Sequence, residues 1–533
     1  MLSHRPSRPS YLALTLTGLL TACGTSQPER ASINRAISAL STGTVSAPVL
    51  ASGVGSSPFA ACTADANQRG VNYADAEVEP WMDVNPSDPK VIVGAWQQDR
   101  WSNGGSRGLV VGRSLDGGAT WQSVPVPGIV KCTGGAYDRA SDPWLSFAPD
   151  GSLYHISLSF NDTTPENAVL VSKSIDSGAT WSAPVTLKQD SRLNASNDKE
   201  SITADRTDSR YVYAIWDRLL SAGGPASAIS TEHAQGYRGP VWFSRTTNAG
   251  ASWETARVIY DPGEINQTIG NQVIVLPSTT SGAAPTLLDG FALIYNHKNS
   301  DNLRGLSVAM IRSEDRGSTW LSPTIISKFN PASVVDPDRL SGGSPFPVRT
   351  GDIIPEFAAD PSTPANVYAV WQDSGSGGIS VIKLSKSADR GQTWSAPIQV
   401  NRTSGTLGLN SQAFNPNVAV NADGTVAVTY ADFRNNAGDN DASVTRTDYF
   451  LTHCHPSAVN GGCAGTAGWS EQRLTPQSFN LQAAPVARGE FLGDYNGLKA
   501  SGTTFLAFYG VADGTLATPA SSIQFTRFDP TAP

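Results

Sequence analysis

Residues 114–121 read SLDGGATW, and this stretch decides the fold because it recurs along the chain. The other copies are SIDSGATW at 174–181, TTNAGASW at 246–253, SEDRGSTW at 313–320 and SADRGQTW at 387–394. Their acidic or amide positions are Asp116, Asp176, Asn248, Asp315 and Asp389, at intervals of 60, 72, 67 and 74 residues. Self-similarity at such a period indicates a repeat architecture. We refer to the five copies as the SxDxGxTW loops.

Each copy lies between two short runs in which apolar and polar residues alternate, such as GLVVGR before the first copy and WQSVPV at its end. This pattern predicts a strand on either side of a hairpin loop. The Asp or Asn side chain can accept backbone N–H groups of the loop, and the Gly can adopt a positive φ. The Trp can cover the turn with apolar surface. The five copies are therefore predicted to be structural turns.

A second pattern of strand, turn and strand lies upstream of the loops, as in EPWMDVNPSDPKVIVGAWQQDR from Glu79. Together the two patterns give four antiparallel strands in each repeat, which predicts an all-β fold, a β-propeller of four-stranded blades. Six complete units can be counted, and in the sixth Trp469 follows a loop that contains Cys454 and Cys463. Residues after 488 supply three more strands, and the fourth could come from near the N-terminus. Seven blades are favoured, with six as the alternative.

The N-terminus has the pattern of a targeting segment. Basic residues precede the apolar stretch Tyr11–Ala22, which is too short to span a bilayer. The stretch ends in LTAC at 20–23, which resembles the lipobox of bacterial lipoproteins. The resemblance implies a signal peptide at 1–22, lipidation of Cys23 and anchorage to the bacterial cell envelope, at the cell surface or on the periplasmic side. Ordinary secretion is the alternative. We expect a tether and N-terminal arm at 23–75 and the propeller at 76–533.

Five cysteines are present, and lipidation of Cys23 leaves four. Cys454 and Cys463 lie nine residues apart in a glycine-rich loop, which favours a local disulfide. Cys62 and Cys132 then pair by elimination. His453 and His455 make a metal site the alternative at the Cys454 loop, but a second close pair of cysteines is missing, and exported proteins favour disulfides. No metal ligand set is predicted.

Composition excludes some classes of partner. The chain has 38 Lys and Arg against 46 Asp and Glu, a net charge of −8, so the basic surface of a nucleic-acid-binding protein is not predicted. Thirteen Trp residues and 39% hydrophobic content are sufficient for a folded core. A monomer without a cofactor is expected, and Ca²⁺ at an acid-rich rim remains an open alternative.

The SxDxGxTW pattern is identified as the Asp-box, or bacterial neuraminidase repeat. Five copies on a predicted propeller resemble the sialidase superfamily over residues 76–533. The resemblance implies a glycoside hydrolase in which a Tyr nucleophile is helped by a Glu, an Asp is the acid and base, and three Arg hold the carboxylate of a sialic acid. The opening Arg-Ile-Pro motif of that superfamily is missing, because this chain has Val78-Glu79-Pro80-Trp81 there.

In an up-and-down blade, the SxDxGxTW loops lie on the face opposite the starts of the first strands and the ends of the second strands. Chemistry is therefore expected on that other face. The candidate catalytic residues there are Tyr495, Glu200 and Asp142, and the candidate substrate-binding residues are Arg100, Arg218, Arg349 and Arg434. The alternative is that these charges pair with one another and cap strand ends.

The sequence thus predicts a lipid-anchored envelope protein with a sialidase-like propeller that acts on or binds a glycan or glycoprotein, and contacts the membrane through its N-terminal lipid. A catalytic protein would be a glycoside hydrolase of the sialidase type. The alternative is a propeller that binds glycan or protein without catalysis, and the residues leave both open.

Overall fold

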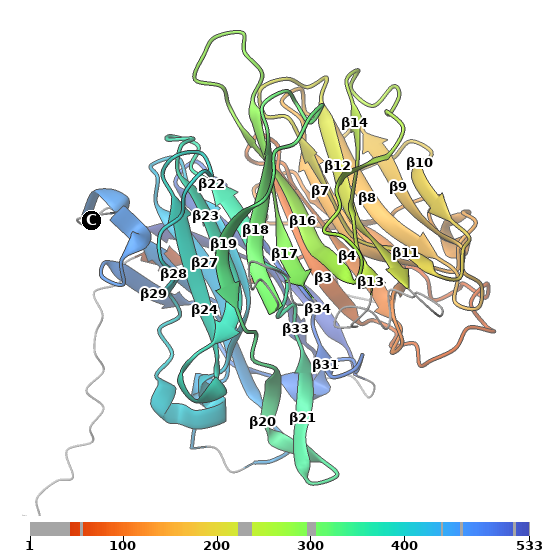
Figure 1. Ribbon diagram of the computed structural model, residues 1–533. Helices are drawn as coiled ribbons and strands as arrows, with labels where there is room; N and C mark the ends of the chain where they lie inside the picture. Colours follow the sequence, from red (N-terminus) through yellow and green to blue (C-terminus); the bar gives the residue numbers. More distant parts are fainter. Residues whose placement is uncertain are drawn as a thin grey trace, which may run out of the picture. The chain divides into compact units, whose positions relative to one another are not determined.

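Strand pairing in the computed structural model gives a series of antiparallel sheets, most with four principal strands. The structure describes residues 43–53, 57–221, 237–295, 305–438, 441–458, 462–514 and 519–531. These lie in one unit, Thr42–Pro533, whereas the other unit, Met1–Ser41, lies outside the described residues together with Cys23. This architecture is consistent with the predicted β-propeller (Figure 1).

The first four sheets follow the chain in order. They comprise β3 (Glu77–Val84), β4 (Ile92–Arg100), β5 (Ser106–Ser114) and β6 (Gln122–Pro125); β7 (Arg139–Phe147), β8 (Leu153–Phe160), β9 (Asn167–Ser174) and β10 (Val185–Asp190); β11 (Ala195–Ala204), β12 (Val212–Ser221), β14 (Val241–Thr246) and β15 (Arg257–Tyr260), with β13 (Tyr237–Arg238) beside β12; and β16 (Asn266–Leu276), β17 (Thr286–Tyr295), β18 (Gly305–Ser313) and β19 (Thr324–Phe329). One bridge between Ser106 and Ala140 joins the first two sheets.

The remaining sheets complete the series. They comprise β22 (Glu356–Ala359), β23 (Val367–Ser374), β24 (Ser380–Ser387) and β25 (Ile398–Gln399); β26 (Ala413–Val420), β27 (Val426–Asp432), β28 (Arg446–Cys454) and β29 (Trp469–Arg473), with β30 (Phe479–Asn480) beside β28; and β32 (Gly497–Ser501), β33 (Thr504–Ala512) and β34 (Ser521–Pro530), joined by β1 (Gly43–Val45) and β2 (Val49–Leu50). The described helices are short 3-10 turns at Lys131–Thr133, Ser376–Gly378, Gly405–Ser411, Arg434–Asn436, Pro456–Ala458, Gly462–Ala464 and Leu481–Ala483.

The last sheet combines the two ends of the described chain. β1 pairs with the C-terminal part of β34, Gly43 opposite Pro530, and β2 pairs with its middle, Val49 opposite Phe525. This is the N-terminal contribution that the sequence predicted for the final unit. The predicted tether and arm therefore include residues 43–50, which add strands to a sheet.

Burial falls from the first strand of a sheet to the last. Every residue of β3 and β7 is buried, whereas β6 and β10 are largely exposed or half-buried. A strand buried on both faces must be covered by neighbouring sheets, and the first strands meet one another accordingly. β3 contacts β7, and the contacts continue through β11, β16, β22, β26 and β32, which in turn contacts β3. We call these seven the inner strands.

One small sheet stands outside this series. β20 (Val334–Ser341) and β21 (Ser344–Arg349) form a hairpin that projects from the remaining strands in Figure 1. β21 also pairs in parallel with β31 (Glu490–Phe491), Arg349 opposite Phe491. The sequence predicts three strands after residue 488, but Glu490 and Phe491 form β31, and the last inner strand begins only at Gly497. The pairing with β21 brings Arg349 next to Asp494.

The SxDxGxTW loops have the turn chemistry that the sequence predicts. In the first loop, the Ser114 hydroxyl donates to Asp116 Oδ1 at 2.8 Å and accepts from Gly118 N at 2.8 Å, while Thr120 N donates to Asp116 Oδ1 at 2.9 Å. The loops centred on Asp176, Asn248, Asp315 and Asp389 repeat these bonds. The glycine at the fifth position of each loop has a φ between 82° and 92°. Each acidic or amide side chain thus stabilises its own turn.

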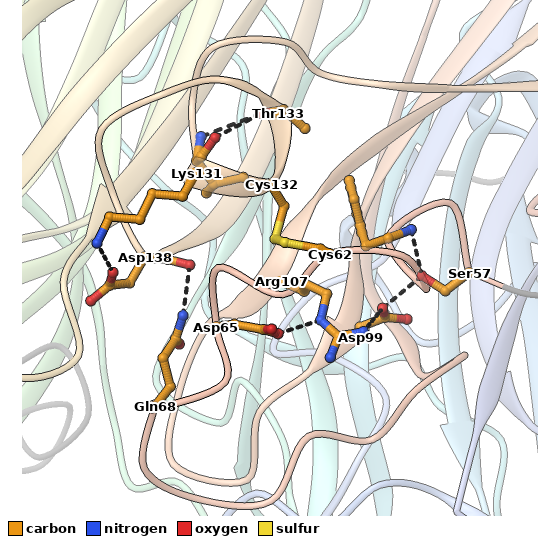
Figure 2. The surroundings of a disulfide bond; sticks show 12 residues. Ser57, Cys62, Asp65, Gln68, Asp99, Arg107, Lys131, Cys132, Thr133 and Asp138 are labelled. Atoms are coloured by element: carbon orange, nitrogen blue, oxygen red, sulfur yellow. Dashed lines mark hydrogen bonds and ion pairs between the residues drawn. A yellow bond between two sulfur atoms is a disulfide. The ribbon is translucent and has the colours of Figure 1, made fainter.

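Both predicted disulfides are confirmed. Cys454 joins Cys463, and Trp469 after that loop donates its indole N–H to Gly465 O at 3.0 Å, much as Trp121 does to Gly118 O at 3.1 Å. Cys62 joins Cys132 and ties the N-terminal arm to the segment between β6 and β7 (Figure 2).

Candidate functional site

The inner strands share a backbone distortion that positions the candidate residues. The pairing register shifts between Val78 and Trp81 in β3, and equivalent shifts occur in β7, β11, β16 and β26. Positive φ at these β-bulges falls on Glu79 (55°), Asp142 (53°), Lys199 (47°), Gly270 (73°) and Asn415 (50°). Such conformations cost non-glycine residues about 1–3 kcal/mol and cluster at functional sites, as do bulges. The side chains at the bulges are therefore candidates for functional residues.

Three bulges have a local cause in the sequence. Proline follows Glu79, Asp142 and Asn415 directly. Proline lacks the N–H that a strand needs for its ladder, so it is confined to edges and bulges within sheets. Sequence reasoning took these residues for strand starts, whereas the strands begin two or three residues earlier and continue through the bulge. Lys199 occupies the equivalent position in β11, with Glu200 in place of proline.

Lys199 is the centre of a buried group of charges. Its Nζ lies 2.8 Å from Asp494 Oδ2, 3.4 Å from Glu79 Oε1 and 3.7 Å from Asp142 Oδ1. Arg349 forms a bidentate pair with the same Asp494, at 3.0 Å from Nε to Oδ1 and 2.6 Å from the terminal nitrogen to Oδ2. Carboxylates from β3, from β7 and from the segment between β31 and β32 thus converge on one ammonium group. We call Glu79, Arg100, Asp142, Lys199, Glu200, Arg349, Asp494 and Tyr495 the inner-strand cluster.

Two of the four predicted substrate-binding arginines meet in this cluster. The guanidinium carbons of Arg100 and Arg349 lie 4.7 Å and 4.3 Å from the centre of the same ring, Phe491. Arg100 donates to Gln97 Oε1 at 2.5 Å. Burial, and then the charge of Arg349, lower the pKa of Arg100 to about 10. The two guanidinium groups form one cationic wall.

The other two predicted arginines are held elsewhere. Arg218 makes a bidentate pair with Asp190, at 2.8 Å and 2.6 Å, and lies over the ring of Trp242. Arg434 pairs with Asp432 and Glu471 and lies 3.7 Å from the centre of the Phe450 ring. Both side chains have partners on the second or outer strands of their regions.

The three predicted catalytic residues lie around one small cavity. Asp142, Glu200 and Tyr495 line it together with Lys199 and Trp144. Glu200 and Tyr495 are only 2% and 4% exposed, and neither Glu200 oxygen nor the Tyr495 hydroxyl has a hydrogen-bond partner in the described chain. Buried polar atoms without partners are rare in native proteins and call for an explanation, such as a catalytic role. The convergence of these three groups is the main chemical feature of the cluster.

Electrostatics separate the two carboxyl groups at this cavity. Burial, and then the charge of Asp142, raise the pKa of Glu200 well above its usual value. Burial also acts to raise the pKa of Asp142, but Lys199 and the Ser141 hydroxyl outweigh it and lower that pKa. Burial raises the pKa of Tyr495, and the surrounding carboxylates raise it further. The surroundings therefore favour the protonated form of Glu200 and the ionised form of Asp142.

A second cavity opens on the face of the second-strand ends. It is lined by Arg100, Arg349, Asp142 and Lys199 and by the loop Ser102–Gly105, and its volume is about 30 Å³, the space of a water molecule. Asp142 and Lys199 line both small cavities. The catalytic-type groups and the cationic wall are thus adjacent, on the face where the sequence predicted the chemistry.

The N-terminal arm supports this face from outside. Asp99, which precedes Arg100, accepts from Ser57 and from Arg107, and Arg107 also pairs with Asp65 (Figure 2). Arg139 holds the loop at Asn103 and Gly104, with bonds of 2.8 Å to each. The disulfide at Cys62 lies within this network.

Lys199 is the residue that sequence reasoning missed. The sequence does contain a signal for Lys199, because the pair Lys199-Glu200 aligns with Glu79-Pro80, Asp142-Pro143 and Asn415-Pro416 in three other inner strands. A cation at a position otherwise acidic or amidic is the exception in that series. Nothing in the sequence indicates that Asp494 and Glu79 are partners of this one lysine.

The described residues contain neither a candidate metal site nor a candidate membrane-spanning helix. No group of three or more His, Cys, Asp or Glu side chains in this part of the chain is placed to hold a metal ion. Among the same residues, no helix has the length and apolar character needed to cross a membrane.

The chain matches no protein-family model and no curated protein. Solved structures that it resembles include a Penicillium chrysogenum α-L-arabinanase complexed with arabinobiose, with 13% identity over 91% of this chain and 98% of that one and a TM-score of 0.42. The phage phi92 endosialidase has 10% identity over 92% of this chain and 70% of that one, with a TM-score of 0.47. A Dyadobacter fermentans protein of unknown function has 14% identity over 74% and 95%, with a TM-score of 0.43. Neither an activity nor a substrate follows for this chain from similarity at this level.

Proposed function

We propose that residues 43–531 form a seven-bladed β-propeller of the sialidase type. The contacts of the inner strands support closure, because the series from β3 returns to β3 through β32. The pairing of β1 and β2 with β34 supports seven blades over six, since it supplies the outer strand of the final sheet. Cys23 would carry the lipid that anchors the exported chain to the cell envelope.

The function that the geometry supports best is hydrolysis of a glycosidic bond in an anionic glycan. The observation that carries this proposal is the convergence of Asp142, Glu200 and Tyr495 on one cavity beside the cationic wall of Arg100 and Arg349. Two carboxyl groups with opposite pKa shifts are the usual equipment of a glycosidase. Paired guanidinium groups suit the carboxylate of an acidic sugar.

The shifted pKa values assign the roles differently from the family resemblance. Tyr495 Oη attacks the anomeric carbon while its proton passes to the ionised Asp142. The glycosidic C–O bond breaks, and the leaving oxygen takes the proton of Glu200, which burial keeps protonated. Water then gives a proton to Glu200 and its oxygen to the sugar, and Tyr495 recovers its proton from Asp142. Lys199, whose Nζ lies 3.7 Å from Asp142 Oδ1, favours the ionised carboxylate that accepts the proton of Tyr495.

Binding without catalysis is the second candidate, and one observation favours it. Arg349 and Lys199 are already engaged with Asp494, so the cluster is largely neutralised from within. Such a closed network fits a propeller that recognises a glycan or protein at its rim and uses the cluster only to hold its inner strands together.

Hydrolysis of a panel of fluorogenic glycosides, with sialosides and uronides among them, distinguishes the two candidates. Tyr495→Phe and Glu200→Gln are each expected to lower kcat/KM by about a thousandfold, the size of effect seen on removing one group of a catalytic set. Tyr368→Phe and Glu356→Gln are matched controls, because each residue is buried and has an oxygen without a partner, as in the cluster. Turnover that is equal in Tyr495→Phe and Tyr368→Phe rejects Tyr495 as nucleophile, and no turnover of any glycoside by the wild type leaves the binding candidate.

A further inference from the structure

A cavity much larger than the two at the inner-strand cluster lies outside that site. Its volume is about 440 Å³, and residues from all seven inner strands line it, among them Trp81, Trp144, Phe357 and Lys499. Its other lining residues come from the later parts of the inner strands and the turns that follow, such as Arg206 and Asp360. It therefore opens toward the face of the SxDxGxTW loops. Pockets of 300–1,000 Å³ with mainly apolar walls and few polar groups are typical ligand sites.

An aromatic wall separates this cavity from the inner-strand cluster. The rings of Trp81 and Trp144 stack at 3.4 Å between centroids, and the Trp144 ring meets Tyr495 edge-on at 5.5 Å. Trp144 lines both the large cavity and the small cavity at Tyr495. A ligand in the large cavity is thus on the opposite side of the indoles from the proposed catalytic groups.

Most polar groups of the large cavity are engaged with the protein. The Thr203 hydroxyl donates to Val273 O at 2.9 Å, and Arg206 pairs with Asp83 at 2.9 Å. Asp360 accepts from the backbone N–H groups of Ser362 and Thr363, at 2.9 Å and 3.0 Å. These groups shape the walls but have little capacity left for a ligand.

Lys499 is different. Its Nζ lies 4.6 Å from the centre of the Trp81 ring, and no carboxylate oxygen of the described residues forms an ion pair with it within 4.0 Å. Burial lowers the pKa of Lys499, and the charges of Asp83 and Glu356 oppose this shift from farther away. Asp83 is paired with Arg206, however, and burial raises the pKa of Glu356 to about 8. Glu356 is then mostly neutral at pH 7. A half-buried ammonium without a close counter-ion is costly, and a ligand anion would relieve that cost.

We propose that this cavity binds a small organic carboxylate with an apolar body, whose carboxylate pairs with Lys499 Nζ and whose body packs on the apolar walls. The charge of Lys499 selects the head group, and the aliphatic and aromatic lining selects the body. The site is independent of the proposed hydrolase, from which the indoles of Trp81 and Trp144 separate it.

Calorimetric titration with decanoate tests the proposal on the full-length protein. The wild type is expected to bind one decanoate per chain, and Lys499→Gln to bind it at least about tenfold more weakly, because the charge-assisted pair is lost. Lys188→Gln is the matched control, since Lys188 Nζ also lies over an indole, 4.5 Å from the Trp242 ring, but outside the cavity. It is expected to bind like the wild type. Methyl decanoate, which has the same body without the charge, is expected to bind the wild type and Lys499→Gln equally weakly.

Equal decanoate affinity in the wild type and Lys499→Gln, or tight binding of the methyl ester, would overturn the carboxylate assignment. If Lys499→Gln does not fold, Ala359→Phe keeps the lysine and narrows the cavity that Ala359 lines. Loss of decanoate binding in that variant supports the site, and unchanged binding overturns it. Several decanoates bound per chain with no effect of any variant also overturn it, since that is the result for non-specific surface adsorption.

Discussion

Positive φ angles occur at two sets of repeated positions, the SxDxGxTW loops and the inner-strand bulges, and the two sets are held in different ways. In the loops the angle falls on a glycine such as Gly118, at 92°, and the hydrogen bonds come from residues within the same eight-residue stretch. In three of the five bulges it falls on a charged residue, Glu79, Asp142 or Lys199, and the ion pairs of Lys199 join distant parts of the chain. The loops are local devices, whereas each bulge depends on the assembled fold.

The pKa values of Asp116 in the first loop and Glu79 in the first bulge are shifted in opposite directions. The Thr120 hydroxyl and backbone N–H, and the Ser114 hydroxyl, lower the pKa of Asp116 to about 2. Burial dominates at Glu79 and raises its pKa to about 8, although Lys199 opposes the shift. The local donors favour the anion of the solvent-exposed Asp116, whereas at the buried Glu79 the cost of desolvation outweighs the charge of Lys199. Polar groups that stabilise their own turn can thus be distinguished by experiment from polar groups that are buried between sheets.

The largest effect is expected from Lys199→Met, which removes the cation shared by three buried carboxylates. Breaking a buried ion pair by deleting one partner costs about 3–5 kcal/mol, because the remaining charges stay buried without compensation. Urea unfolding at pH 7 measures this loss. Lys173→Met is the control, since Lys173 is partly exposed and its Nζ donates to a backbone oxygen, Ala249 O at 2.8 Å, with no ion pair to any residue that the structure describes. A similar unfolding midpoint for the two variants would show that Lys199 does not hold the cluster together.

The next largest loss of stability is expected from Gly118→Ala, a substitution in the first SxDxGxTW loop. A Cβ there would collide with the ring of Phe525 as well as meet a φ of 92°, so the cost is about 3 kcal/mol, from strain and overpacking together. Gly134→Ala separates the two causes, because Gly134 has a φ of 83° with no atom within 4 Å of the added carbon. It should cost about 1 kcal/mol. Equal losses in thermal unfolding would mean that packing at Phe525 contributes nothing.

The same contrast explains how much the sequence could predict. The loop at Asp116 carries its whole explanation in eight residues, so its turn, the flanking strands and the repeat fold follow from the pattern. The disulfide at Cys454 was equally local. The cluster is not local, because Lys199, Asp494 and Glu79 meet only when the first, third and last sheets are assembled. Residue types alone could nominate Tyr495 and Glu200, but not the lysine beside them or the partners of Arg218.

A buried carboxyl group on an inner strand, Glu356, is expected to lower the stability of the protein at alkaline pH. Burial raises the pKa of Glu356 to about 8 in the folded state, from about 4.5. A raised pKa contributes stability below pH 4.5 that is progressively lost as the pH rises through 8, because the unfolded chain ionises first. The unfolding midpoint of the wild type should therefore be lower at pH 9 than at pH 6. Glu356→Gln should show a smaller fall, and Asp116→Asn should show the wild-type fall, because Asp116 is ionised throughout. A fall of the same size in Glu356→Gln would place the alkaline sensitivity on other groups.

The smallest effect is expected at Asp116, where the third loop already provides a natural comparison. Asn248 occupies the same position, accepts from Ser252 N at 2.9 Å and donates to the Ser252 hydroxyl at 2.8 Å. Asp116→Asn should therefore keep the turn and change stability at pH 7 by less than about 0.5 kcal/mol, whereas Asp116→Ala loses the acceptor and costs about 1 kcal/mol. The depressed pKa adds a pH signature, because the stability that Asp116 contributes above pH 4 is lost as the pH falls toward 2. Asp116→Asn should lack this component on acid titration, and an unchanged acid limb would mean that the turn is held by its hydroxyl and backbone bonds rather than by the charge.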